Sequence, residues 1–466
     1  MKHSLLFIVI LLNFSVSGQT NSAADSLSTI SVKADQLVSS WMDTRHAPGL
    51  ALAVIQDGSI VKLTYYGQSN VETKSPVTGE SVFMIASLTK QFIAAAIILL
   101  QQDGRLSLDD HPGKYIDSLP GTWDDITIRQ LLSHTSGIIR DPVDYHPYMK
   151  QPVLSVIRSM YTLPLNAKPG ESWLYSNAGY YVLAEIISRV SGQEWDRFIL
   201  ERILAPAGLN SVRVINAEDL VTDRVSGYHY NNSTRKLMNA ENWIAVRPSG
   251  AFAATLKDMA AWDIFLETSP LINKEAKQLL WTPATLNNQK QTNYGFGYYT
   301  DPFLGHNRVH HDGQYPGFRS EYQHFIDDRL GIIILSNLDN SGLESLSLQI
   351  AALYKHELAP PAFKVSVSVP SQNVAERDIP ITITVRAEGK TAPGSVMEME
   401  IWDASNKPVN KQNRQNETFE VSKDKTFQLH WTPPAPGTYT VNVGIFGPRW
   451  SIPFSWNEKA AVLSVK

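Results

Sequence analysis

Residues 83–104 read FMIASLTKQFIAAAIILLQQDG, in which a serine and a lysine precede a long apolar run. Ser87 and Lys90 are three residues apart, just under one helical turn, so a helix places both side chains on one face. The run behind them is apolar almost all round, which predicts a helix buried in a protein core. Gly104 follows the run and is expected to close this helix as its C′ residue.

This stretch has two interpretations. In the first, burial removes the hydration of Lys90 and lowers its pKa, so the lysine accepts a proton at neutral pH and activates Ser87 as a nucleophile. The positive end of the helix dipole then lies where an oxyanion forms. In the second, Ser87 only caps the helix and Lys90 is solvated, an arrangement that also arises often by chance.

The composition indicates a globular protein of more than one domain. The chain has 466 residues, of which 43% are hydrophobic and 10% aromatic, enough for two or three domains with sizeable cores. Its net charge of −4, without basic runs, gives no sign of binding to nucleic acid or to an anionic membrane surface. The chain has no cysteine, which excludes disulfides, thiolate chemistry and a lipid-bearing cysteine.

The N-terminus has the pattern of a secretory signal peptide. Lys2 and His3 are followed by the apolar run LLFIVILL (residues 5–12), which is too short to span a bilayer. Ser17 and Gly18 are small residues that suit cleavage before Gln19. The alternative is a buried first helix, which the extreme N-terminal position and the polar residues that follow disfavour. No other stretch reaches membrane-spanning length, so we expect a periplasmic or secreted protein without a transmembrane segment after cleavage.

Periodic apolar residues predict helices and strands between residues 23 and 358. Helices are expected at 23–45, 126–132, about 180–192, 256–266 with Thr255 as N-cap, and 343–358. Strands are expected at 49–56 and 60–66, joined as a hairpin through Asp57 and Gly58, and at 318–326 and 331–336.

Three other segments carry candidate functional residues. Tyr175 and Asn177 stand on the loop before the helix at 180–192, where the alternative roles are an aromatic packed under the helix start and an asparagine cap. His134 lies between a helix end and a glycine turn, and a structural hydrogen bond is the better interpretation there. His311 and Gly313 come just before the strand pair, and Gly313 permits close approach of a ligand or another strand.

The pattern of residue types changes from residue 364 onward. Segments 365–369, 381–385, 396–401, 426–431 and 438–443 alternate with period two between turn residues, which predicts an antiparallel β-sandwich of about 100 residues. Pro360 and Pro361 mark the linker. The predicted organisation is therefore a signal peptide at 1–18, a first domain at 19–361 and a sandwich domain at 362–466.

Three weak signals occur in one order, namely Ser87-x-x-Lys90, Tyr175-x-Asn177 and His311-x-Gly313. With the flanking phrases LLSHTSG and PGESWLYSN, they resemble the serine β-lactamase and penicillin-binding-protein superfamily over roughly residues 30–358. The branch with a Tyr-x-Asn element, which includes class C β-lactamases, esterases and D-aminopeptidases, is the most similar. The resemblance implies an α+β fold with an antiparallel sheet, flanking helices, a helical lobe and a site in the cleft between them.

The resemblance also implies a role for each matching residue. Ser87 is expected to be the acylated nucleophile, with Lys90 and Tyr175 as the proton-transferring pair and Asn177 as a partner of Lys90 and the substrate. Which member of the pair holds the proton stays open, because the two titrations are coupled. The backbone N–H groups of Ser87 and Gln314 are expected to form the oxyanion hole beside Gly313 and His311. No cofactor or metal is implied, and His310, His311 and Asp312 are too crowded for one tetrahedral zinc site.

One motif departs from the family pattern. The third element is His311-Asp312-Gly313, where β-lactamases and transpeptidases usually have Lys-Thr-Gly. A histidine is mostly neutral at pH 7, and Asp312 would repel a substrate carboxylate if it faced the cleft. Arg319 is expected to form a surface salt bridge rather than to bind the substrate.

These features favour a serine hydrolase that acts on ester or peptide-like amide bonds. One alternative is a true β-lactamase or D,D-carboxypeptidase, and another is a non-catalytic binding protein. The C-terminal segments around Trp431 and Trp450 resemble immunoglobulin-like accessory modules of secreted bacterial enzymes, which suggests contact with a polysaccharide or a protein. Trp450 and Trp456 would stack on sugar if exposed, but we expect them in the core.

Overall fold

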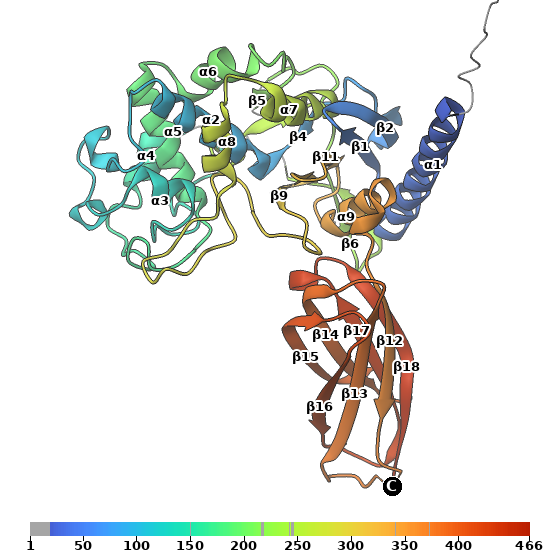
Figure 1. The fold of residues 1–466 in the computed structure, drawn as a ribbon. Coiled ribbons are helices and arrows are strands. Elements are labelled where there is room, and N and C mark those ends of the chain that lie inside the picture. The colour runs from blue at the N-terminus through green and yellow to red at the C-terminus, as the bar shows by residue number, and fades with distance from the viewer. Residues whose placement is uncertain are drawn as a thin grey trace, which may run out of the picture.

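The computed structural model describes residues 19–149, 151–215, 219–241, 243, 247–340, 342–371 and 373–466. The expected signal peptide at 1–18 lies outside the described residues. Figure 1 shows a part that mixes helices and strands, and below it an all-β part that ends at the C-terminus. None of the helices in the described ranges combines the length and hydrophobicity needed to span a bilayer.

The mixed part is built on a six-stranded antiparallel sheet with the order β3-β2-β1-β11-β10-β9. The predicted hairpin forms, and Asp57 and Gly58 both have positive φ at its turn. His311 precedes the predicted strand pair, as expected, but it lies inside an additional edge strand, β9, that was not predicted. The strands are β1 (Gly49–Gln56), β2 (Ser59–Asn70), β3 (Ser75–Pro76), β9 (Arg308–Tyr315), β10 (Phe318–Phe325) and β11 (Leu330–Ser336).

The central strands β1, β11 and β10 of this sheet are buried on both faces. Along β1, Leu50, Leu52 and Val54 belong to a core shared with α1 (Gln19–Arg45) and α9 (Glu344–Tyr354), which lie side by side in Figure 1. The alternate residues Ala51 and Ala53 face a larger core under α7. Alternation of side chains across a strand explains why β1 reads as a continuous apolar run.

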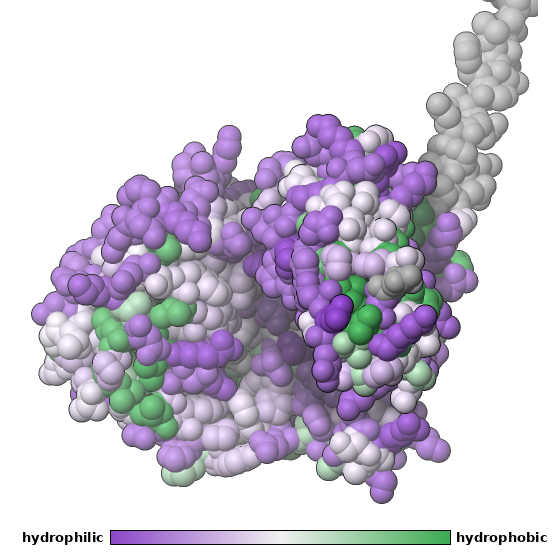
Figure 2. Space-filling model, turned by 90° about the horizontal axis from the view of Figure 1, so that it is seen from below, coloured by the Kyte–Doolittle hydropathy of each residue, from purple (hydrophilic) through white to green (hydrophobic). Residues whose placement is uncertain are grey.

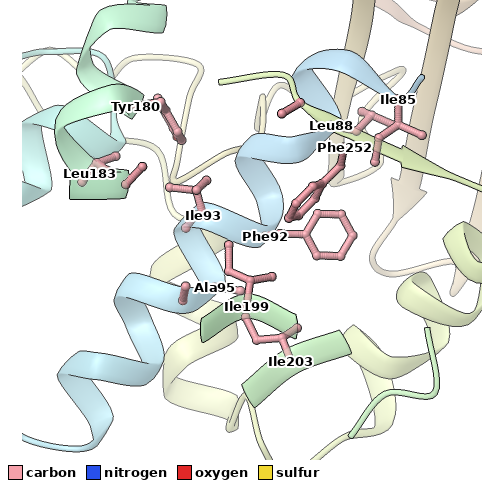
Figure 3. Packing of buried hydrophobic residues seen from close by; sticks show 14 of the residues in the cluster. Ile85, Leu88, Phe92, Ile93, Ala95, Tyr180, Leu183, Ile199, Ile203 and Phe252 are labelled. Carbon is pink, nitrogen blue, oxygen red and sulfur yellow. The ribbon is translucent and has the colours of Figure 1, made fainter. Parts of the chain in front are cut away.

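The predicted serine helix is α2 (Thr89–Gln102), and Gly104 follows its cap with a positive φ, as expected. Its residues from Thr89 to Leu100 are all buried. Phe92 packs against Phe252 and Trp262, with ring centroids 5.5 and 4.5 Å apart, and Ile93 points to the other side of the helix, towards Tyr180 (Figure 3). This all-round burial fixes the position of α2 in the centre of the larger core.

Most of the remaining helices form a lobe to one side of the sheet (Figure 1), whereas α7 packs on the sheet itself. Thr255 is the N-cap of α7, as predicted, and its hydroxyl accepts a hydrogen bond from Asp258 N. Helix α5 begins at Asn177, about three residues earlier than expected, so Asn177 is not on a loop, and its N-cap is Ser176. The helices are α3 (Ile128–Leu132), α4 (Val153–Arg158), α5 (Asn177–Ser191), α6 (Trp195–Ile199), α7 (Leu256–Thr268) and α8 (Lys274–Trp281).

Two small sheets that were not predicted complete this part. One has the order β4-β8-β5, and the other is the hairpin β6-β7, whose tip contains the turn after Asn231. Their strands are β4 (Phe83–Met84), β5 (Arg213–Val214), β6 (Tyr228–Asn231), β7 (Lys236–Asn239) and β8 (Phe252–Ala254). The combination of antiparallel sheets and helices confirms the predicted α+β class.

The C-terminal part is a sandwich of a three-stranded sheet, β12-β13-β16, and a four-stranded sheet, β15-β14-β17-β18. Ile381 and Val385 of the first sheet share one buried cluster with Met397 and Val441 of the second. Strands β15 and β18 were not predicted. The residues of β15 are polar along most of its length, so this strand lacks the alternation of apolar and polar residues. The strands are β12 (Ala362–Ser368), β13 (Ile379–Glu388), β14 (Ala392–Trp402), β15 (Pro408–Phe419), β16 (Asp424–Trp431), β17 (Gly437–Phe446) and β18 (Pro453–Val465).

The expectation that two tryptophans fill the sandwich core is wrong. Trp456 is 40% exposed and Trp450 is half-buried, and both rings lie near Phe446 at the surface. The face of the molecule seen from below is mostly hydrophilic, with scattered hydrophobic patches and a shadowed hollow near its centre (Figure 2).

Candidate active site

Ser87 lies in a single 3₁₀ turn, Ala86–Leu88, that leads directly into α2. Its Oγ is 3.2 Å from Lys90 Nζ and 3.1 Å from the Tyr175 hydroxyl oxygen. Both distances are in the range of hydrogen bonds, so the serine has one basic and one hydroxyl partner. The turn and the helix therefore bring together the two side chains that the sequence placed on one face.

Lys90 is completely buried, which excludes the solvated lysine of the alternative interpretation. Besides Ser87, its Nζ donates to Asn177 Oδ1 at 2.8 Å and to the Ser249 carbonyl at 2.7 Å. Burial lowers the pKa of Lys90 well below its ordinary value, and the positive charge of Arg247 lowers it further. A neutral amine has two N–H donors, which match the two carbonyl acceptors, and one lone pair, which can accept from the Ser87 hydroxyl.

Tyr175 stands over the same serine from the loop before α5. Burial raises the pKa of Tyr175 well above its ordinary value, although the hydrogen bond to Ser87 acts in the opposite direction. Lys90 Nζ lies 4.9 Å from the centre of the Tyr175 ring and the Arg140 guanidinium lies 5.3 Å from it. Because burial raises its pKa, the phenol is protonated at neutral pH and donates its hydrogen bond to the serine.

Asn177 links the lysine to charged residues that the sequence did not reveal. Its Oδ1 accepts from Lys90, and its Nδ2 donates to Asp141 Oδ1 at 2.8 Å. Asp141 Oδ1 also accepts from Arg247 at 3.1 Å. Because a carboxylate only accepts, Asp141 fixes the amide orientation that aims the oxygen of Asn177 at Lys90. The predicted partnership of Asn177 with Lys90 is thus present.

His311 is buried and does not reach the cavity surface, unlike its neighbour Asp312. Its Nδ1 is 2.6 Å from the Asp312 carbonyl, which can only accept, so Nδ1 carries the proton and Nε2 accepts from Tyr294 at 3.0 Å. Burial lowers the pKa of His311 to about 4. The imidazole is neutral at pH 7, as expected, and it supports the aromatic wall around Tyr175.

Gly313 allows strand β9 to approach the serine turn. A Cβ atom at this position would lie 2.4 Å from the Ile85 carbonyl and 2.2 Å from Ser320 Oγ, so only glycine fits. Its neighbours Asp312 and Gln314 are exposed and line the same cavity as Ser87. Arg319 pairs with Asp312 at 3.1 Å, which agrees with its expected role in a salt bridge.

The cavity at Ser87 has a volume of about 900 Å³. Tyr175, Asn177 and Gln314 line it together with the serine, so most of the predicted site residues meet there. The lining residues that were missed include Arg140, Trp173, Arg247 and Tyr299. Trp173 lies within a quoted motif and offered a signal, whereas the other three lie on segments without a recognisable pattern.

His134 has the structural role that we expected. Its Nδ1 accepts a hydrogen bond from Ser176 N at 3.1 Å, and its ring lies 4.3 Å from the Tyr175 ring. Burial lowers the pKa of His134 well below its ordinary value, so it is neutral. It therefore holds the loop that carries Tyr175. Within the described ranges, no group of three or more histidine and acidic side chains is arranged to hold a metal ion.

This fold and this arrangement of residues belong to a known class. The family model described as Beta-lactamase matches residues 34–354, which is more than half of the chain. The chain therefore belongs to the Beta-lactamase family. This result confirms the resemblance seen in the motifs, the predicted fold and the assignment to a family of serine hydrolases.

Individual relatives cover different shares of the chain. It is 30% identical to Penicillin-binding protein 4* of Bacillus subtilis over 309 residues, 62% of this chain and 68% of that protein. It is 26% identical to D-aminopeptidase of Brucella anthropi over 307 residues, 64% of this chain but only 57% of that protein.

A solved structure resembles more of the chain. The octameric penicillin-binding protein homologue from Pyrococcus abyssi has a TM-score of 0.63 at 22% identity. The match covers 90% of this chain and 98% of that one. This coverage is more than residues 1–361 could supply, so the similarity in fold extends into the sandwich.

The contact between Gly313 and the serine turn generates a prediction. Replacing Gly313→Ala should lower kcat/KM by more than about tenfold, because the added methyl group pushes β9 away from Ile85 and separates the N–H groups of Ser87 and Gln314. Gly113→Ala is the matched control, since nothing lies within 4 Å of its added Cβ. Ester hydrolysis and thermal unfolding of both variants test this, and unchanged turnover by Gly313→Ala would contradict it.

Proposed function

We propose that the protein hydrolyses ester or peptide-like amide bonds through an acyl-enzyme on Ser87. The observation that supports this most directly is the placement of Ser87 Oγ between a buried lysine amine and a buried phenol at the wall of a cavity. The lowered pKa of Lys90 and the raised pKa of Tyr175 favour one resting state, a neutral amine beside a protonated phenol. In this state Tyr175 rather than Lys90 holds the proton, which was the point that the sequence left open.

In the proposed acylation, Ser87 Oγ attacks the carbonyl carbon while its proton moves to Lys90 Nζ. The negative charge that develops on the carbonyl oxygen is stabilised by the backbone N–H groups of Ser87 and Gln314. Tyr175 then donates its proton to the leaving alcohol or amine as the scissile bond breaks, and Lys90 returns a proton to Tyr175. Asn177, held by Asp141, keeps the lysine aligned and hydrogen-bonds the substrate.

Deacylation reverses these roles with water as the nucleophile. Water attacks the acyl carbon, its proton passes to the Lys90–Tyr175 pair, and Ser87 Oγ leaves with a proton from the same pair. The substrate acid is released and the resting state returns. All proton transfers use groups that already touch Ser87 in the free protein.

Ser87→Ala should lower ester turnover by about a thousandfold or more, because it removes the nucleophile and leaves the fold intact. The assay is initial-rate hydrolysis of nitrophenyl acetate, with Ser155→Ala on the exposed face of α4 as the control. In intact-mass measurement, a fluorophosphonate probe should add the mass of one covalent adduct to the wild type and none to Ser87→Ala. Substantial turnover by the variant would overturn the mechanism, and a wild type that neither turns over nor is labelled would favour a non-catalytic binding protein.

The proposed base makes the pH profile predictable. Only neutral Lys90 accepts a proton, so kcat/KM should fall as the pH drops through the lowered pKa of Lys90. Arg247→Gln removes a positive charge that holds this pKa down, and the acidic limb should move to higher pH by about half a unit or more. Arg129→Gln, which breaks a surface pair with Asp109, should leave the limb in place. An acidic limb that stays fixed or moves to lower pH in Arg247→Gln would exclude Lys90 as the base.

A second candidate is a β-lactamase or D,D-carboxypeptidase, which needs a partner for a substrate carboxylate. Arg140 lines the cavity next to Tyr175 with a side chain that is 70% exposed, and it offers such a partner. Asp312 faces the same cavity and disfavours an anion. Comparing a chromogenic cephalosporin with a D-alanyl anilide and the ester separates the candidates, since a fast cephalosporin rate would make β-lactam hydrolysis the main activity.

We further propose that the protein is exported and consists of a hydrolase domain at 19–361 and a sandwich domain at 362–466. The basic start, short apolar run and small residues before Gln19 support a cleaved signal peptide. The mature protein from a Gram-negative expression host should begin at Gln19 by intact-mass measurement. A Ser17→Pro, Gly18→Pro double variant should block this cleavage, and an unprocessed wild type in the cytoplasm would exclude export.

A further inference from the structure

A loop of the sandwich contacts the wall of the active-site cavity. Between β17 and β18, the residues Arg449 and Trp450 have φ values of +54° and +65°, although neither is glycine. Such left-handed backbone is costly for residues with a side chain and persists where the surroundings hold it. Here Ile452, only 2% exposed, belongs to the buried cluster that contains Phe303 and Leu343 of the other part. The loop is therefore anchored in the catalytic part.

Arg449 uses this anchor to reach a buried carboxylate. Its guanidinium pairs with Asp301, which is 9% exposed and also accepts from Arg308 at 2.7 Å and from His310 Nε2 at 2.8 Å. These neighbours hold the pKa of Asp301 far below its ordinary value in spite of its burial. A carboxylate that is buried and multiply paired gives a defined position to each of its partners.

The same guanidinium lies 5.9 Å from the centre of the Tyr299 ring, which also stacks on His310 at 5.2 Å. Tyr299 in turn lies 5.3 Å from the His311 ring and 6.1 Å from the Trp173 ring. A residue that comes from the sandwich therefore lies against Tyr299.

Tyr299 and Trp173 form the boundary between two cavities. Both line the catalytic cavity at Ser87, and both also line an adjoining cavity of about 480 Å³ that Arg449 completes. A volume of this size is typical of a binding site for a small molecule or part of a substrate. The other lining groups include hydroxyls and side-chain amides, from Ser172, Thr292, Asn288, Gln291 and Asn293.

We propose that this adjoining cavity is a subsite for a peptide-like extension of the substrate and that Arg449 shapes it. The amide and hydroxyl groups of the lining both donate and accept hydrogen bonds, as the successive amide groups of a peptide require. The flat rings of Trp173 and Tyr299 suit an extended chain that passes from the scissile bond into the second cavity. The inference rests on the proposed acyl transfer at Ser87, and it makes the sandwich part of substrate selection.

The test compares short and extended substrates with the full-length protein. The short substrate is nitrophenyl acetate. The extended ones are a nitrophenyl ester of acetyl-trialanine and a depsipeptide with trialanine on the leaving side, each with L- and with D-alanine. The wild type should hydrolyse one extended form with at least about tenfold higher kcat/KM than the acetate. Arg449→Ala should lose most of this preference through KM, and it should keep the acetate rate within about twofold.

Two further variants make the comparison specific. Arg386→Ala is the matched control, because Arg386 also pairs with an aspartate, Asp424, but on the exposed surface of the sandwich. Asn293→Trp, at an exposed position, should fill the second cavity and reproduce the loss on extended substrates even if Arg449→Ala folds poorly. Arg449→Lys retains the charge and should restore part of the preference.

Three outcomes would overturn the subsite: a wild type that does not prefer any extended substrate, a preference that survives both Arg449→Ala and Asn293→Trp, or acetate turnover that falls as much as peptide turnover in both variants. Failure of the proposed acyl transfer is a separate result, because it would show as a wild type without serine-dependent turnover of nitrophenyl acetate.

Discussion

The burial of the Lys90 amine is the constraint on which the site depends. A lysine with no exposed surface loses most of its hydration, and the Ser249 carbonyl and Asn177 replace that hydration with two fixed acceptors. The remaining position on the nitrogen faces Ser87. The apolar helix α2 therefore matters in two ways, because the same burial that fixes the helix in the core also lowers the pKa of its lysine.

Several parts of the chain are needed to enclose this amine. Ser87 and Lys90 come from the start of α2, Asn177 from the start of α5, and Ser249 from the segment before β8. Strand β9 closes the arrangement from the edge of the large sheet, and it approaches closely because Gly313 has no side chain. The site is thus a junction between the sheet and the helical lobe, and a shift of either would separate the hydrogen-bonding partners.

The sandwich contacts this junction directly through Arg449 and is not merely attached by the linker. Its loop at Arg449 enters the charged cluster of Asp301, Arg308 and His310, and the last two of these belong to β9, the strand that carries His311. Exposed ion pairs contribute little to stability, but a pair with a buried carboxylate fixes geometry. The rings of Trp450 and Trp456 lie near Phe446, at the end of β17, and they are not part of the sandwich core.

The sequence by itself determined the local structure and the chemical identity of the central residues. Apolar periodicity identified α2 and the hairpin, glycine and threonine marked helix ends at Gly104 and Thr255, and motif order brought Ser87, Lys90, Tyr175 and Asn177 together. These features depend on residues that are near one another in the chain, or on a spacing that the family shares. The edge strand at His311 was missed because its residues alternate weakly, and β15 was missed because both of its faces are mostly polar.

Only the tertiary structure decided which charges surround the lysine and what lies beyond the catalytic cavity. Asp141 and Arg247 meet through a contact between residues 106 positions apart, and Arg449 meets Asp301 from the other part of the chain. The burial that sets the pKa values of Lys90, Tyr175 and His311 is likewise a property of everything packed around them. Such properties are sums over distant segments, and no local pattern in the sequence encodes them.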